Sequence, residues 1–139
     1  MPGFTTDASQ AMLLDFLTGR AVAYAAPRNA YLGLAVTVPD SVDGPITLAT
    51  VGEVVTAGYA RVLAPWAAPA GSPIAIASNA DIEFGPVTVD MDDAAQYAFL
   101  TEASSGTVGT VLYVWQLIEP VLAKANKPIF VASGALTIQ

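Results

Sequence analysis

The sequence has neither cysteine nor histidine among its 139 residues. Without cysteine there are no disulfides and no thiolate chemistry, and the lack of histidine removes the commonest general base and metal ligand. Basic residues are also scarce, since 5 Lys and Arg against 12 Asp and Glu give a net charge of −7. Binding nucleic-acid phosphates requires clustered lysine and arginine, so we expect no nucleic-acid partner.

Charge of either sign is low. Charged residues make up 12% of the chain and apolar residues 54%, whereas an average soluble domain is about 25% charged. No apolar run approaches the roughly 18–20 residues that cross a bilayer, so we expect no membrane segment. A surface poor in charge is typical of a protein covered by copies or partners. A monomer with a surface rich in threonine, serine and alanine is the alternative.

What is present is strand-forming sequence, organised around a hairpin. Residues 96–103 and 110–118 are rich in aromatic and β-branched side chains, which suit a half-buried pleated surface. Between them, Ser104, Ser105, Gly106 and Gly109 supply the turn, because glycine accepts a positive φ without a steric penalty. We therefore predict two paired antiparallel strands at the centre of the fold.

The rest of the chain predicts one helix and several further strands. The helix spans Asp7–Leu17, with Met12, Leu13, Phe16 and Leu17 on one stripe, and either closes one end of a sandwich or binds a neighbouring subunit. Residues 46–57 hold a helical turn around 51–55 or an excursion loop, and 119–127 form a polar loop. The other expected strands are 31–38, 58–63, 74–77, 81–84, 87–89, 128–132 and 135–138.

This pattern predicts an all-β chain: an antiparallel β-sandwich, jelly-roll or immunoglobulin-like, of seven or eight short strands with one N-terminal helix. The length fits a single domain over residues 1–139, with an arm and helix in 1–28 and the sandwich in 29–139. Lysine is nearly missing from the strands, although it commonly guards exposed sheet edges. The edges are therefore covered, either by loops or by another chain.

Three groups of residues are candidates for chemistry. Residues 90–93 form an acidic cluster, but the calcium-loop pattern is missing, so a solvated loop is favoured over a metal site. Asp81 and Glu83 would share a strand face as paired glycosidase carboxylates do, and an outward polar face explains them equally well. The aromatic residues can form a sugar platform, although burial is favoured. We expect no enzyme, cofactor or metal.

The order of several short motifs resembles a family of small virion proteins of tailed bacteriophages, described as tail-fibre-like or head-decoration proteins. The motifs are a helix at 10–19, an Ala-Tyr-x-Ala-Pro connector at 23–27, a strand at 29–34, Gly-Tyr-Ala-Arg at 58–61, a strand pair around Ser-Asn at 74–84, a hairpin at 97–117 and a closing strand at 134–138. Departures fall in the loops 39–56 and 65–73. The resemblance implies a structural part of the virion, assembled in the host cytoplasm, with no catalytic residues.

Within this class, we expect a capsid decoration protein that binds the major capsid protein or other virion proteins. It would be a homo-oligomer, with a trimer among the options, and would act by burying apolar surface. A tail or neck fibre-like protein is the close alternative, and a host-glycan-binding adhesin module is another. The expected partner-interface residues are Met12, Leu13, Phe16, Val42, Ile46 and Trp66.

Overall fold

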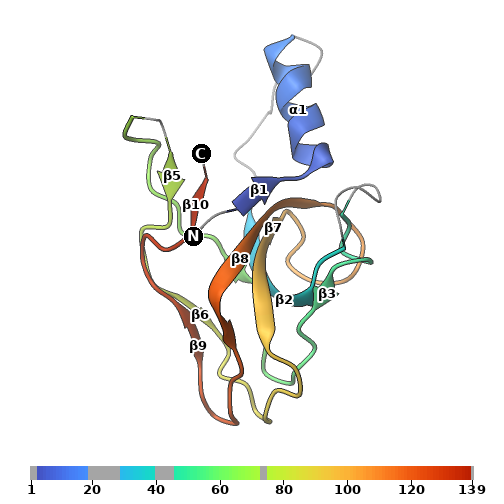
Figure 1. The fold of residues 1–139 in the computed structure, drawn as a ribbon, viewed down its shortest axis with the longest axis vertical. Helices are drawn as coiled ribbons and strands as arrows, with labels where there is room; N and C mark the ends of the chain where they lie inside the picture. The colour runs from blue at the N-terminus through green and yellow to red at the C-terminus, as the bar shows by residue number, and fades with distance from the viewer. Residues whose placement is uncertain (1–2, 19–28, 40–45, 73–74, 139) are drawn as a thin grey trace.

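The computed structural model describes residues 3–18, 29–39, 46–72 and 75–138. Its strands form one six-stranded antiparallel sheet and two two-stranded ribbons, and the described residues include a single helix (Figure 1). The elements are β1 Gly3–Thr5, α1 Asp7–Leu17, β2 Tyr31–Thr37, β3 Gly52–Glu53, β4 Val62–Leu63, β5 Ile76–Ala77, β6 Ile82–Phe84, β7 Ala95–Thr101, β8 Val111–Val121, β9 Ile129–Val131 and β10 Thr137–Ile138. The prediction of an all-β sandwich with one N-terminal helix is confirmed.

The predicted hairpin is the centre of the large sheet. β7 pairs with β8 on one side and with β2 on the other, β1 extends the sheet beyond β8, and β3 and β4 share the outer edge of β2. β8 is longer than predicted, because its pairing with β7 continues to Val121 opposite Ala95. The start of the expected polar loop at 119–127 is therefore strand.

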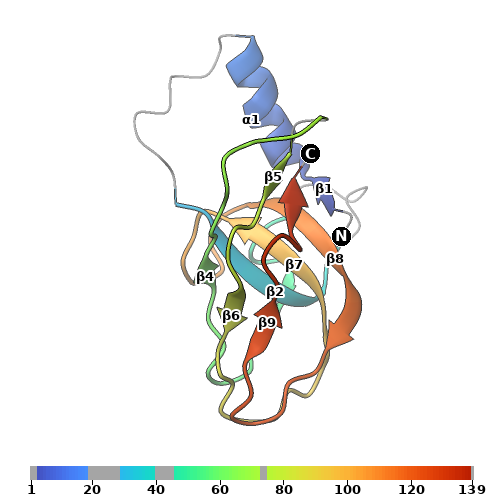
Figure 2. The ribbon, with the colours of Figure 1, turned by 90° about the vertical axis from the view of Figure 1, so that its left-hand side faces the viewer.

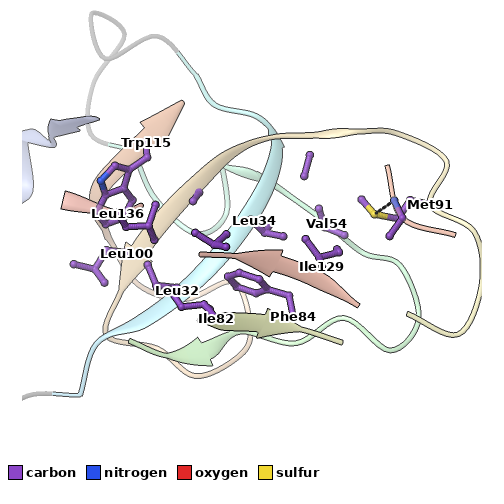
Figure 3. Packing of buried hydrophobic residues seen from close by; sticks show 14 of the residues in the cluster. Leu32, Leu34, Val54, Ile82, Phe84, Met91, Leu100, Trp115, Ile129 and Leu136 are labelled. Carbon is purple, nitrogen blue, oxygen red and sulfur yellow. Dashed lines mark hydrogen bonds between the residues drawn. The ribbon is translucent and has the colours of Figure 1, made fainter. Parts of the chain in front are cut away.

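The two ribbons form the second layer. β6 pairs with β9 and β5 pairs with β10, and in Figure 2 both ribbons lie in front of the large sheet. The main apolar cluster fills the space between the layers, as Figure 3 shows for Leu32 and Leu34 of β2, Phe84 of β6, Ile129 of β9 and Trp115 of β8. Their side chains are all nearly inaccessible to solvent.

The opposite face of the large sheet is also covered. Ala35, Phe99 and Val114 point away from the ribbons and pack in a second cluster with Ile46, Leu48 and Val51. The segment 46–51 thus acts as a lid over this face, and the helical turn expected around 51–55 is wrong: Thr47 forms an isolated bridge with Thr110, and β3 pairs with β2. The strand expected at 87–89 is also absent from the structure, where these residues form no ladder.

Gly33 of β2 leaves the space that the Phe99 ring of β7 occupies. A Cβ there would overlap the Phe99 ring, which stands opposite Gly33 in the register. We therefore expect Gly33→Ala to lower the free energy of unfolding by about 1–3 kcal/mol through overpacking. Urea titration followed by circular dichroism would measure this. Adding Phe99→Leu should recover part of the loss, and a double variant as unstable as the sum of both single variants would contradict the overlap.

Candidate interaction surface

Helix α1 stands at one end of the molecule (Figure 1), and it carries several exposed leucines. Its Asp7 lies in the first turn, and β1 before it is anchored because the Thr6 hydroxyl donates to the Val111 carbonyl at 2.6 Å. Leu13, Leu14 and Leu17 are 57, 60 and 68% exposed. Since positions three and four apart share a helix face, these leucines form one patch, called here the α1 patch.

The three leucines of the α1 patch do not pack on the sandwich. The helix contacts β8 and no other described element closely, and its leucines face outward. A helix of 11 residues is marginal by itself in water and normally depends on packing of its apolar side. The exposed leucines therefore favour the alternative, in which α1 packs against a second protein.

The other predicted interface residues are scattered. Ile46 is buried in the second cluster and Trp66 is half-buried, packed against the main cluster with its ring 6.0 Å from that of Trp115. Burial within the chain makes Ile46 a core residue in place of a contact residue. Val42 lies outside the described residues, as do the side chains of Met12 and Phe16. Of the predicted set, the structure thus places Leu13 on an exposed apolar surface.

The Gly-Tyr-Ala-Arg element organises a polar network at the outer edge of β2. Arg61 binds both carboxylate oxygens of Glu53, with Nε donating to Oε1 at 2.8 Å and Nη2 to Oε2 at 2.5 Å. The same guanidinium donates to the carbonyls of Ala103 and Gly106 at 3.0 and 2.7 Å and lies over the Phe99 ring. Its side chain is 3% exposed. Arg61 therefore holds the β7–β8 turn against the strands β3 and β4.

Tyr59 fills the gap between those two short strands. β4 pairs with Leu32 and β3 with Ala35, so the intervening Leu34 has no ladder partner for its N–H. The Tyr59 hydroxyl accepts that N–H at 2.7 Å and donates to Glu53 at 3.0 Å. Burial, and secondly the Glu53 carboxylate, raise the pKa of Tyr59 far above its ordinary value. The hydroxyl is therefore a permanent donor, and the network is structural.

Gly58 allows this element to lie against the neighbouring loop. Its φ is +90°, and a Cβ at this position would collide with the Pro86 carbonyl oxygen. The adjacent Ala57 carbonyl accepts the Thr88 N–H at 2.8 Å. From the sequence, the Gly-Tyr-Ala-Arg element was identified only as a motif, without its ion pair. The available signal for an internal ion pair was Arg61, which stands among apolar residues in a chain with few charges.

The carboxylates that the sequence offered for chemistry lie at the surface. Asp81 accepts the Ser133 N–H at 2.8 Å beside the β6–β9 ribbon, while Glu83 stands opposite Phe130 and is exposed. Within the described ranges, no three acidic side chains are grouped so that they could hold a metal ion. No helix in the described part of the chain has the length and apolar character to cross a membrane.

Comparison with known proteins identifies the family. A family model described as podophage GP4 fiber I protein gp80 matches residues 4–139. The chain belongs to this fibre family. The match covers every described element except the first residue of β1, and it confirms the resemblance to virion proteins of tailed phages. Membership of the fibre I family implies a structural component of the virion. A search of the curated proteins gives no match.

Proposed function

We propose that this chain is a fibre subunit of a tailed phage that assembles with further copies of itself and with other virion proteins, without catalysing a reaction. The match to the fibre I family over residues 4–139 supports this proposal most strongly. The α1 patch provides an apolar surface of the kind that subunits bury on association. The low charge of the chain, 12%, agrees with a surface largely covered in the particle.

The head-decoration role expected from the sequence is the alternative within the same class. A family described as a fibre protein fits a fibre position at least as well as a position on the capsid. Gold-labelled antibodies against the purified chain, imaged on native particles by electron microscopy, separate the two. Label on projecting fibres supports the proposal, label spread evenly over the head supports decoration, and particles without label would refute both.

The α1 patch gives a specific test of assembly. Replacing Leu13, Leu14 and Leu17 together by glutamine keeps helix propensity close to that of leucine. Each half-exposed leucine that becomes buried contributes about 1 kcal/mol, so we expect self-association to weaken roughly 100-fold. Sedimentation velocity over a concentration series measures this. The melting temperature of the dilute monomer should stay nearly constant, because the three side chains lie outside both apolar clusters.

A matched control replaces three other apolar residues, which are on average more exposed than the leucines, by glutamine. Val108, Ile118 and Phe130 are 88, 80 and 60% exposed and belong to neither apolar cluster. This variant should associate like the unmodified chain. If it loses association as strongly as the α1 variant does, association reflects general surface hydrophobicity and the role of the α1 patch is refuted.

A further inference from the structure

A second surface lies at the outer edge of the large sheet, between the segment around β3 and the loop before β7. It is a groove of about 410 Å³ lined by Val36, residues 52–57, Val89, Asp90, Asp92 and Asp93. One wall follows β3, and the other is the acidic loop that the sequence analysis assigned to solvent. We call it the 52–57/89–93 groove.

Hydrogen bonds within the chain hold both walls in place. Val54 donates to the Leu34 carbonyl at 2.9 Å, and Thr88 donates to the Ala57 carbonyl at 2.8 Å. On the acidic side, the Met91 side chain is buried, and its sulfur accepts the Ala123 N–H at 3.3 Å (Figure 3). The groove is therefore preformed, and a ligand would enter it without first ordering the walls.

The charge of the groove has one sign. Glu53 is neutralised by Arg61 inside the network, and Asp90 is bound by Lys124 at 3.3 Å in an exposed pair. The Ala125 N–H, and secondly Lys124, lower the pKa of Asp90, so it remains ionised. Asp92 and Asp93 are exposed, with no ion pair among the described residues. Two carboxylates thus remain to attract a cationic ligand.

Exposed apolar side chains border these carboxylates. Val55 is 96% exposed and Val89 is 50% exposed, and both line the groove. A ligand that satisfies the whole surface needs positive charge together with aliphatic groups, as in a peptide that carries lysine or arginine next to apolar residues. Because no described acidic trio can hold a metal ion, a cation alone fits the surface less well.

A second copy of this chain is a poor match in charge, because its 12 Asp and Glu outnumber its 5 Lys and Arg. Its net charge is −7, its Arg61 is paired with its own Glu53, and its Lys124 is paired with its own Asp90. Among the described basic residues, Lys127 alone remains available to a neighbour. We propose that the 52–57/89–93 groove binds a basic, partly apolar peptide segment of a different virion protein and so attaches the subunit to its neighbour in the particle. This inference rests on the proposed fibre function.

A defined peptide tests the groove on the purified chain. The probe is a fluorescein-labelled octapeptide of alternating lysine and valine, with binding followed by fluorescence anisotropy at low salt. We expect saturable 1:1 binding that weakens as salt screens the carboxylates. Asp92→Asn with Asp93→Asn should reduce affinity about tenfold, because two exposed ion pairs are lost. Val55→Ser with Val89→Ser should also weaken it.

The matched control removes two carboxylates elsewhere. The double variant Glu83→Gln with Glu119→Gln removes the same amount of charge from two exposed residues outside the groove. Its affinity for the lysine–valine peptide should stay within about twofold of that of the unmodified chain, since only long-range charge is altered. Equal weakening in both variants would overturn the proposal. So would equal binding of a lysine–serine octapeptide, because charge alone would then explain the affinity.

Native particles identify the partner. Carbodiimide cross-linking followed by mass spectrometry should join Asp92 or Asp93 to a lysine of another virion protein, and a cross-link to a second copy of this chain would overturn the choice of partner. Antibody labelling tests the virion position separately. If antibodies label the fibre but the purified chain does not bind the peptide, the groove proposal alone is refuted. If the purified chain binds the peptide but antibodies find no copy of it in particles, the proposed function alone is refuted.

Discussion

Replacing Arg61 by methionine is expected to lower the free energy of unfolding by about 3–5 kcal/mol, as breaking a buried ion pair generally does. Methionine retains an unbranched apolar stem but removes the guanidinium donors, so the Glu53 carboxylate keeps only the Tyr59 hydroxyl and the carbonyls of Ala103 and Gly106 lose the Arg61 N–H groups. Urea unfolding followed by far-ultraviolet circular dichroism measures the change. The β7–β8 turn should also exchange its amide hydrogens faster, because the side chain that fixes it is gone.

Two comparisons isolate the cause of that loss. Lys124→Met breaks the exposed pair with Asp90, whose side chains are 68 and 56% exposed, and should cost at most about 1 kcal/mol. Arg61→Lys keeps the charge but cannot bind both carboxylate oxygens and two carbonyls. Its loss in free energy of unfolding should therefore lie between those of Arg61→Met and Lys124→Met. An Arg61→Met variant no less stable than Lys124→Met would show that the network contributes little.

The central hairpin and the helix could be predicted because their signals are local. β7 and β8 combine aromatic and β-branched residues with a serine- and glycine-rich turn, and α1 matches the expected Asp7–Leu17. The ribbons could not be paired in the same way. β5 and β6 are next to each other in the sequence, but each pairs with a strand from the C-terminal segment, β10 and β9 respectively. Strands of two or three residues carry no register signal of their own.

The role of residues near 46 was missed for a related reason. Ile46 follows a proline-containing loop, which suggested an exposed contact, whereas the side of β2 and β7 bearing Ala35 and Phe99 required a cover. Apolar residues on both faces of two paired strands were the available signal. The groove was missed because its walls, residues 52–57 and 89–93, come from separate parts of the sequence. An acidic loop also has the same sequence pattern whether it faces open solvent or a concave surface.

Replacing Trp115 by alanine should have an effect as large as the loss of Arg61, and it tests the packing between the layers. Trp115 is fully buried, its ring lies 4.7 Å from that of Tyr113, and its Nε1 donates to the Thr137 carbonyl at 2.9 Å. It thus connects β8 of the large sheet to β10 of a ribbon. Removal of a buried tryptophan side chain should cost about 3–5 kcal/mol.

Two further variants separate packing from hydrogen bonding and from general surface effects. Trp115→Phe retains much of the ring but leaves the Thr137 carbonyl without its donor, for a loss of about 1–3 kcal/mol. Phe130→Ala removes a ring that is 60% exposed and should change stability by about 0.5 kcal/mol or less. Circular dichroism is the appropriate probe, since the substitution itself alters tryptophan fluorescence. If Trp115→Ala were no more harmful than Phe130→Ala, the β5–β10 ribbon would not depend on Trp115, and the two-layer core would have to be held together elsewhere.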